Sequence, residues 1–360
     1  MLFAAFAIAS AFFSQPFAAG AAIGKRLAGN VVGAGGTVII DPAGVYIRAT
    51  SVNGGGLIAG YAAQDGSQHV LRTAKSTDGG LSWRPQGEVY RADSANHDLD
   101  NAFVLQLPNG RILYAYRNHD RPNGQYTWYR ITIAYSDDGG ITFKFLSTVA
   151  ERGANGFNGL WEPFLRVAKD GSLQCYYSAE NGATDQDGFV KYSYDGGSTW
   201  SNATPMTVSG AGVTSRDGMI GVANIDGNGN LMAVFENTEA GGRFSIDYVR
   251  SHDDGRSWGE RGRLYTASNN GQAIAPQIIN VGGTLVASFM TDESTGANGA
   301  DGAQMKVVTS TNGGQTWGGS VVTGQVASHW PGLFTRDSTH FLALYSKDGQ
   351  GAVSQLYQIV

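Results

Sequence analysis

The stretch Ser76-Thr77-Asp78-Gly79-Gly80-Leu81-Ser82-Trp83 occurs five times, in slightly varied form, along this chain of 360 residues. Every copy reads Ser-x-Asp-x-Gly-x-x-aromatic, except that Asn312 replaces Asp in the last and Phe143 replaces Trp in the second. A nearly constant spacing of this size indicates a repeat architecture. The copies are 60, 57, 58 and 59 positions apart and start at Ser76, Ser136, Ser193, Ser251 and Ser310.

The residue types of this repeat predict a tight turn. An Asp or Asn side chain accepts hydrogen bonds from the backbone N–H groups that follow it, and Gly supplies the positive φ that such a turn needs. The aromatic residue then opens the next strand. Five calcium sites are the alternative, but one carboxylate per copy offers too few oxygen ligands for that ion. We therefore interpret the copies as structural turns that hold repeating units together.

The composition and the pattern around the turns predict an all-β protein. The chain has 52 glycines, and 42% of its residues are hydrophobic while 15% are charged. Short runs rich in Val, Ile, Tyr and Phe recur in the order strand, turn, strand, loop, strand, repeat turn, strand. The last repeat has only three such runs, and one spare run stands at residues 37–40. We predict a six-bladed β-propeller of four-stranded antiparallel blades, closed by this N-terminal strand.

The N-terminus predicts secretion. Residues 2–13 form an apolar run of signal-peptide length, although no basic residue precedes it, so we divide the chain into a signal peptide (1–20) and one propeller domain (21–360). Cys175 is the single cysteine, and Asn202 heads the one glycosylation sequon. The net charge of −5 without a basic cluster argues against nucleic acid or membrane partners. The histidines show no metal-ligand spacing, so we expect neither a metal nor another cofactor.

Alignment of the repeats predicts where chemistry would occur. In a propeller the first strand of each blade lines the central channel, and the starts of these strands meet at one mouth. One polar or aromatic side chain per blade falls near that mouth, and together they form a ring: Arg48, Asn101, Glu162, Asp217, Gln277 and Trp330. The alternative interpretation is that this ring only lines a water-filled structural channel.

Two glutamates differ from the others by their context. Glu162 stands between bulky apolar neighbours at an inner-strand start, and Glu236 ends the second strand of the next blade. A carboxylate in such surroundings costs desolvation free energy unless it has partners or a task. Glycoside hydrolysis requires two carboxylates that flank the bond to be cleaved. We therefore predict Glu162 and Glu236 as a catalytic pair, with Glu180 as the next candidate, and Trp161 as a surface for a sugar ring.

These segments resemble glycoside hydrolase family 93, within the class of sialidase-like propellers. The resemblance runs from about residue 45 to the C-terminus and is carried by Gly159-Leu160-Trp161-Glu162-Pro163-Phe164 and by residues 176–181, 215–219 and 235–237. It implies a secreted exo-1,5-α-L-arabinanase that releases arabinobiose with retention. It also implies Glu162 as acid/base and Glu236 as nucleophile.

The partner of the enzyme would be a neutral polysaccharide, arabinan, bound by a monomer. We expect Arg216 to keep the nucleophile ionised. The predicted substrate-binding residues are Arg48, Asn101, Trp161, Glu180, Arg216, Asp217, Gln277, Trp330 and Tyr345.

Two alternatives stay open at the level of sequence. A sialidase would use Asp65 as acid and Tyr345 as nucleophile, and would need converging arginines for the sialic acid carboxylate. The available arginines are Arg48, Arg117 and Arg216, and the Ile-Pro that follows the sialidase arginine is absent here. A sugar-binding propeller without catalytic activity is the second alternative.

Overall fold

The computed structural model describes residues 29–201, 206–239, 242–296 and 299–360. The predicted signal peptide and Asn202 lie outside these residues. The described chain is built from β-strands, with two 3-10 turns, η1 (Pro122–Gly124) and η2 (Ala300–Gly302). None of its helices is long and apolar enough to span a membrane. The strands are β1 (Val31–Asp41), β2 (Gly44–Val52), β3 (Gly56–Asp65), β4 (Gln68–Ser76), β5 (Arg84–Asp93), β6 (His97–Gln106), β7 (Ile112–Asp120), β8 (Trp128–Ser136), β9 (Lys144–Gly153), β10 (Leu160–Val167), β11 (Leu173–Gly182), β12 (Asp185–Ser193), β13 (Met206–Ser209), β14 (Ser215–Asn224), β15 (Leu231–Glu239), β16 (Ser245–Ser251), β17 (Gly259–Tyr265), β18 (Ala273–Val281), β19 (Thr284–Thr291), β20 (Gln304–Ser310), β21 (Gly318–Gly324), β22 (Ser328–Thr335), β23 (His340–Lys347) and β24 (Gly351–Ile359).

These strands pair into five sheets in a propeller arrangement. Four sheets have four strands each, in the orders β2-β3-β4-β5, β6-β7-β8-β9, β18-β19-β20-β21 and β1-β24-β23-β22. The fifth sheet has eight strands and contains β10 to β17. The all-β propeller is thus confirmed, but the strand pairing does not give the six separate sheets that we predicted.

The eight-stranded sheet consists of two four-stranded groups whose strands pair at a single pair of residues. The strands β12 and β14 pair in parallel only at Gln186 and Arg216. The short outer strand β13 covers β12 from Gly188 to Val190 and does not reach Gln186. The edge of β12 is therefore open at that point, and Arg216 Nη2 donates to Gln186 Oε1 at 2.9 Å.

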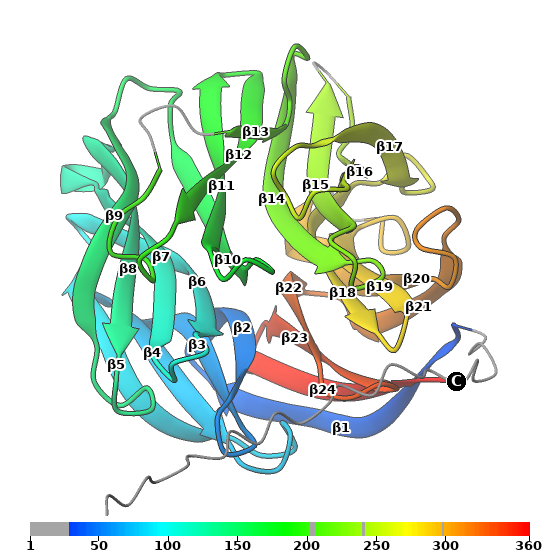
Figure 1. Cartoon of the computed structure of the whole chain (residues 1–360), viewed down its shortest axis with the longest axis horizontal. Helices are drawn as coiled ribbons and strands as arrows, with labels where there is room; N and C mark the ends of the chain where they lie inside the picture. The colour runs from blue at the N-terminus through cyan, green and yellow to red at the C-terminus, as the bar shows by residue number, and fades with distance from the viewer. Residues whose placement is uncertain (1–28, 202–205, 240–241, 297–298) are drawn as a thin grey trace, which may run out of the picture.

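The innermost strands form a closed ring. Figure 1 shows β2, β6, β10, β14, β18 and β22 around the centre, with β1, β9 and β17 toward the rim. Each inner strand contacts the next, and β22 contacts β2. The N-terminal strand β1 pairs antiparallel with β24, with Thr37 opposite Gln355 and Ile39 opposite Val353. The prediction that residues 37–40 complete the C-terminal sheet is confirmed.

The repeat turns are structural, as predicted. Asp78 Oδ1 accepts the N–H groups of Leu81 and Ser82 at 3.0 and 2.9 Å, and Asp78 Oδ2 accepts the Ser82 hydroxyl at 2.6 Å. These bonds, chiefly the one from the Ser82 hydroxyl, lower the pKa of Asp78 to about 2. The carboxylate is thus occupied by its own turn.

Each turn also packs against the preceding group of strands. A Cβ atom on Gly80 would lie 2.3 Å from Leu342, and Trp83 Nε1 donates to Ser354 Oγ at 3.0 Å. In the same way, Trp200 Nε1 donates to Ser147 Oγ at 3.0 Å. The turns therefore join neighbouring blades, which explains why the aromatic residue and the second glycine recur.

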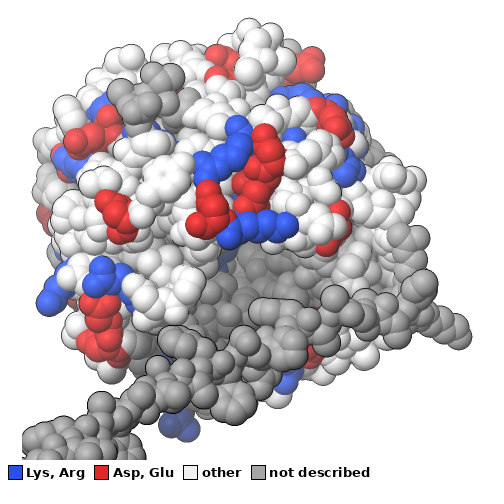
Figure 2. Space-filling view, in the orientation of Figure 1, with Lys and Arg blue, Asp and Glu red and all other residues white. Residues whose placement is uncertain are grey.

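The core lies between adjacent blades. The largest fully buried side chains are aromatic, and one comes from the second strand of each four-stranded group: Tyr61, Tyr114, Tyr176, Phe235, Phe289 and Phe341. On the face in Figure 2, acidic and basic side chains are intermixed rather than gathered by sign.

Candidate active site

A β-bulge near the start of every inner strand shapes one end of the channel. Each of the six strands shows a register shift at this point. The bulge residue has a positive φ, a conformation that costs a residue other than glycine about 1–2 kcal/mol. Because all six strands share it, this conformation belongs to the architecture and is not a special feature of one catalytic residue. The six bulge residues are Tyr46, Asn101, Glu162, Met219, Ala275 and Trp330.

A second set of side chains faces these bulges from the neighbouring second strands. Three of them accept a hydrogen bond from the N–H of the next bulge residue: Ser346 from Tyr46 at 3.0 Å, Ser178 from Met219 at 3.0 Å, and Glu236 from Ala275 at 2.7 Å. This set, called the junction positions below, pairs with the residue just before each bulge: Ala62, Arg117, Ser178, Glu236, Met290 and Ser346.

The bulges bring Glu162 and Glu236 to the same end of the channel. Glu162 is the bulge residue of β10, and Glu236 holds the junction position of β15, opposite Gly218. A Cβ on Gly218 would lie 3.3 Å from Glu236 Oε1, so this glycine leaves room for the carboxylate. The charge of Glu236 also acts on the pKa of Glu162, which places the two carboxylates within electrostatic reach.

The surroundings of Glu162 favour its neutral form. Burial, followed by the negative charge of Glu236, raises its pKa to about 8, against the opposing effects of Arg117, the Ser178 hydroxyl and the Met219 N–H. Its Oε2 atom is buried and has no hydrogen-bond partner among the described residues. A carboxyl group held this way carries a proton at neutral pH and can donate it.

The surroundings of Glu236 are more favourable to a charge. Burial raises its pKa above the usual range, but the Ala275 N–H and the positive charge of Arg216 oppose the shift. We expected Arg216 to be the partner of this group. Arg216 acts only through its charge, because its Nη2 donates to Glu180 Oε1 at 2.8 Å. The direct donor is the backbone of Ala275.

Glu180 secures the segment before Glu162. Its Oε2 accepts the N–H of Gly159 at 2.9 Å, and its own N–H donates to the Gly159 carbonyl at 3.0 Å. A Cβ on Gly159 would lie 2.3 Å from the indole of Trp161, so the ring lies directly over this glycine. Glu180 therefore supports the position of Trp161 and is tied into an ion pair with Arg216.

Trp161 stands in a cluster of aromatic rings. Its ring centroid lies 5.2 Å from that of His119, 5.9 Å from Tyr126 and 5.8 Å from Tyr129, all edge to face. Burial lowers the pKa of His119 to about 3, so this imidazole is neutral. The cluster holds the indole next to Glu162, and Trp161 remains partly exposed there.

The structure also brings Asp98 and Asp100 to the mouth, which the sequence analysis did not single out, together with Arg117, which it named only for the sialidase alternative. Arg117, at the junction position of β7, donates to Asn101 Oδ1 at 3.2 Å and to Asp98 Oδ1 at 3.1 Å, and lies 3.5 Å from Asp100 Oδ2. Its guanidinium carbon lies 5.4 Å from the Trp161 ring centroid. The run Asp98-x-Asp100 before the bulge residue Asn101 was the available signal, because it puts two carboxylates on one face of an inner strand.

Two predicted residues lie deeper in the channel than the bulges, and a third lies at the mouth. Arg48 and Gln277 stand two positions beyond the bulges of their strands, and both line a channel cavity of about 550 Å³. Arg48 is only 3% exposed, and its guanidinium lies 4.1 Å from the Tyr46 ring centroid. Trp330 is itself a bulge residue and lines a separate cavity of about 410 Å³.

Two predicted substrate-binding residues are not brought to the mouth. Asp217 is fully buried, and its carboxylate accepts bonds from Arg261, Ser215 and Asn237. It pairs across the sheet with Asn237, on the face opposite to that of Glu236. Tyr345 is 4% exposed and packs in an apolar cluster, because the junction position of its strand belongs to the next residue, Ser346.

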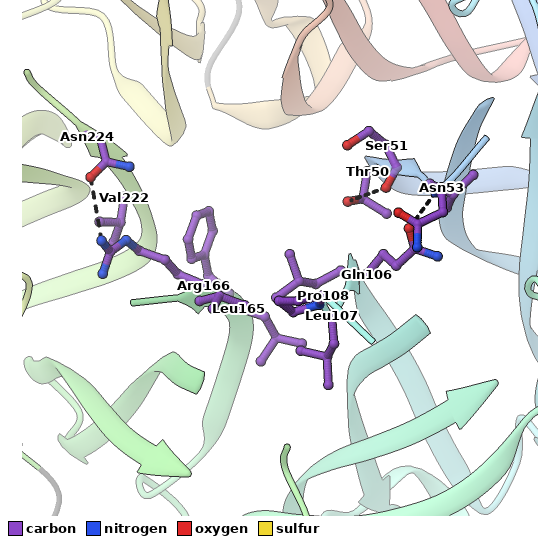
Figure 3. Close-up of a pocket in the computed structure, with 14 residues that line it drawn as sticks. Thr50, Ser51, Asn53, Gln106, Leu107, Pro108, Leu165, Arg166, Val222 and Asn224 are labelled. Atoms are coloured by element: carbon purple, nitrogen blue, oxygen red, sulfur yellow. Dashed lines mark hydrogen bonds between the residues drawn. The ribbon is translucent and has the colours of Figure 1, made fainter. Parts of the chain in front are cut away.

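Toward the opposite end of the channel, the cavity lined by Arg48 and Gln277 overlaps with a second one of about 510 Å³, drawn in Figure 3; Thr50, Phe164 and Val222 line both. The second cavity is lined by the last residues of inner strands, such as Ser51, Gln106 and Asn224, far along those strands from the bulges. Its Arg166 contacts Asp254 and donates to Gln174 Oε1 at 2.8 Å. No pair of carboxylates lines it, so we place the candidate active site at the bulge end.

Comparison with solved structures supports this fold. An α-L-arabinanase of Penicillium chrysogenum, solved with arabinobiose, superposes with a TM-score of 0.70 at 22% identity, over 89% of this chain and 94% of that one. The α-L-arabinofuranosidase of Fusarium graminearum from glycoside hydrolase family 93, also solved with arabinobiose, gives 0.69 at 23% identity, over 89% and 94%. The Hadza microbial sialidase Hz136 gives 0.63 at 19% identity, over 88% and 66%.

At these identities the similarity establishes a common fold, and the resemblance to family 93 is confirmed at that level. The curated proteins contain no match. The sequence profile of the BNR repeat-like domain matches residues 58–323, which is well over half of the chain. The chain therefore belongs to the BNR repeat-like domain family, and its propeller is of the sialidase-like kind.

Proposed function

We propose that this protein is a retaining glycoside hydrolase that cleaves linear α-1,5-L-arabinan from the non-reducing end and releases arabinobiose. The observation that carries the proposal is the pair Glu162 and Glu236, two carboxyl groups at one end of the channel in different surroundings. Glycosidases need this difference, because one group must begin protonated and the other ionised.

The roles follow from these surroundings. Glu162, whose pKa is about 8, protonates the glycosidic oxygen as it leaves. Glu236 attacks the anomeric carbon, and the bond to the leaving group breaks as the glycosyl–enzyme ester forms. A water molecule then gives its proton to Glu162 and displaces Glu236. Retention by this route requires carboxyl groups about 5–5.5 Å apart.

The substrate class rests on two further considerations. The arabinanase and the arabinofuranosidase with the same fold were solved with arabinobiose. In addition, two of the three arginines of the sialidase alternative are already paired with carboxylates: Arg117 with Asp98, and Arg216 with Glu180. A neutral furanose needs no free guanidinium, whereas a sialic acid carboxylate does. Trp161 would contact one sugar ring, and Asn101 and Trp330 border the same mouth.

A sialidase is less well supported. Burial raises the pKa of Tyr345, the nucleophile of that alternative, which makes its phenolate less accessible. Its acid, Asp65, lies in ion pairs with Arg72 and Arg91. Both side chains thus have other surroundings and partners.

The proposal includes six blades and secretion. The strands β10–β13 and β14–β17 each have the order of a complete four-stranded blade and share one pair of residues. Counted as two blades, they bring the total to six, one for each inner strand of the ring. We also propose that the protein is secreted, because of the apolar run at residues 2–13 and the polymeric substrate, and that it acts as a monomer.

The test is incubation with linear arabinan, debranched arabinan and a sialoside, with the products separated by chromatography. We expect arabinobiose from the arabinans and no cleavage of the sialoside. Glu162→Gln should abolish release, while Glu88→Gln, which changes an exposed glutamate paired with Arg91, should not. Sialoside cleavage at a comparable rate would reject the proposal. If the wild type binds arabinan without cleaving it, and Glu162→Gln binds it with the same affinity, the protein is a sugar-binding propeller.

A further inference from the structure

Arg117 is the one positively charged residue among the six junction positions. Where Ser178, Glu236 and Ser346 stand, the side chain accepts a hydrogen bond from the bulge residue of the next inner strand. At the junction that faces Glu162, the residue is Arg117, which has only donors. An arginine there is therefore placed to interact with the Glu162 carboxylate instead of its backbone N–H.

Arg117 is nevertheless turned toward its own blade. Its Nη2 donates to Asp98 Oδ1 at 3.1 Å and lies 3.5 Å from Asp100 Oδ2, while Nη1 donates to Asn101 Oδ1 at 3.2 Å. None of the ion pairs among the described residues joins Arg117 to Glu162. The guanidinium thus has two acidic partners and leaves Glu162 Oε2 without a bond.

Asp98 is the buried carboxylate that holds the Arg117 guanidinium in this orientation. It is 4% exposed, and its Oδ2 accepts the hydroxyl of Tyr126 at 2.6 Å. Although burial opposes ionisation, the charge of Arg117 and the Tyr126 bond hold the pKa of Asp98 below its usual range. Asp98 is therefore charged, and it and Asp100 together exceed the single positive charge of Arg117 when both are ionised.

The groups around Glu162 come from several strands. Glu236 on β15 favours its neutral form, whereas Arg117 on β7, the Ser178 hydroxyl on β11 and the Met219 N–H on β14 favour its anion. On β2, Tyr46 and Arg48 also interact electrostatically with Glu162. Arg117 is the first opposing influence after burial and Glu236. The position of its guanidinium therefore bears directly on the proton of Glu162.

We propose that Asp98 is a positioning residue that holds the Arg117 guanidinium away from Glu162, so that Glu162 keeps its proton at neutral pH. The inference rests on the proposed function only in calling Glu162 the acid of the reaction. The contact itself does not depend on the substrate. Asp98 touches no reacting atom and acts through Arg117.

The test measures the titration of Glu162 by ¹³C NMR of glutamate-labelled protein, with its signal assigned from Glu162→Gln. Asp98→Asn removes the negative charge that holds Arg117 Nη2, so the pKa of Glu162 should fall by about 1 unit, on the scale of one added neighbouring charge. Arg117→Gln should raise it by a similar amount. Asp137→Asn, in the exposed pair with Arg111 of the same blade, is the matched control and should shift nothing.

The double variant Asp98→Asn/Arg117→Gln distinguishes an effect of Asp98 that acts through Arg117 from a direct electrostatic effect of Asp98 on Glu162. If Asp98 acts through Arg117, its substitution should have little effect once Arg117 is gone. A full Asp98→Asn shift in that background, or no shift in folded Asp98→Asn, would overturn the proposal. Should Asp98→Asn fail to fold, Tyr126→Phe loosens Asp98 and should shift the titration in the same, downward direction.

The pH dependence of kcat/KM provides a second readout, since its upper limb should move with the NMR value in each variant. The NMR experiment gives its answer even for a protein that cleaves no arabinan. If the proposed function is wrong, the wild type will not cleave arabinan. If the role of Asp98 is wrong, the pKa of Glu162 will be the same in Asp98→Asn as in the wild type.

Discussion

The Oε2 atom of Glu236 lies 2.7 Å from the backbone nitrogen of Ala275 and accepts its hydrogen bond. The bond crosses from β15 to the bulge of the next inner strand, where Ala275 is fully buried with a φ of 56°. It fixes one carboxylate oxygen and leaves Oε1 on the side of Gly218. A nucleophile needs this combination of a fixed orientation and one free oxygen.

Replacement of Glu236 should therefore remove catalysis without unfolding the protein. We expect Glu236→Ala to lower kcat by roughly 10⁴-fold or more, the scale on which loss of a nucleophile acts. Azide should restore part of the rate by attacking the face that the carboxylate vacated. Glu88→Ala, on the exposed strand β5, is the control. Near-normal activity on arabinan in Glu236→Ala would exclude this residue as nucleophile.

The activity should have a bell-shaped pH dependence set by the two carboxyl groups. As pH rises through about 8, Glu162 loses the proton that it must donate, and kcat/KM should fall. On the acid side, kcat/KM should fall as Glu236, whose pKa is raised by burial, becomes protonated. Glu162→Gln should lose the upper limb and retain more activity on aryl glycosides, whose leaving groups need less protonation. An unchanged upper limb in that variant would contradict the assignment.

The same group should make stability depend on pH. The pKa of Glu162 is raised on folding, so its contribution is fully present below the unfolded value near 4.5 and is lost as pH rises through about 8. Urea unfolding at pH 5 and pH 9 measures this. We expect Glu162→Gln to become more stable relative to the wild type at the higher pH, and a constant difference would argue against a neutral Glu162.

A methyl group on Gly159 should displace the indole of Trp161, because the added Cβ would lie 2.3 Å from the ring. We expect Gly159→Ala to raise KM for arabinan more than it lowers kcat, as loss of a substrate contact would. Gly182→Ala in the same blade is the matched control, since a Cβ there meets nothing within 4 Å. Equal effects of the two substitutions on KM would count against Trp161 as a substrate contact.

The repeat turns should tolerate Asn better than Ala. In the last turn, Asn312 Oδ1 already accepts the Thr316 N–H at 3.0 Å, and its Nδ2 donates to the Thr316 hydroxyl at 2.8 Å. Because Asp78 is exposed, we expect Asp78→Ala to cost about 0.5–2 kcal/mol, as loss of a helix cap does, and Asp78→Asn clearly less. Chemical denaturation measures both. Lost turnover at unchanged stability would contradict the structural role.

The repeat turns made the propeller and its closing strand predictable, because their spacing counts strands directly. It was harder to predict on which face of its strand an individual side chain lies. Asp217 and Tyr345 each stand one residue away from a position that faces the bulges, and a shift of one residue turns a strand side chain to the other face. The bulges themselves carry no residue signature, since Tyr, Asn, Glu, Met, Ala and Trp all occupy them. The bridge between Gln186 and Arg216 depends on where β13 stops, which the sequence pattern does not specify.

The pairing of β1 with β24 has a consequence for how the chain folds. Val31 pairs with Ile359, so β1 stays without its partner until β24 has been synthesised. Contacts this distant in sequence form slowly, because a long loop must close before they contribute free energy. An intermediate with every other sheet formed would carry an open edge on β23, the kind of edge that pairs with other molecules. Pairing of the nine residues of β24 with β23 covers that edge, so we expect the C-terminal strand to limit association between incompletely folded molecules.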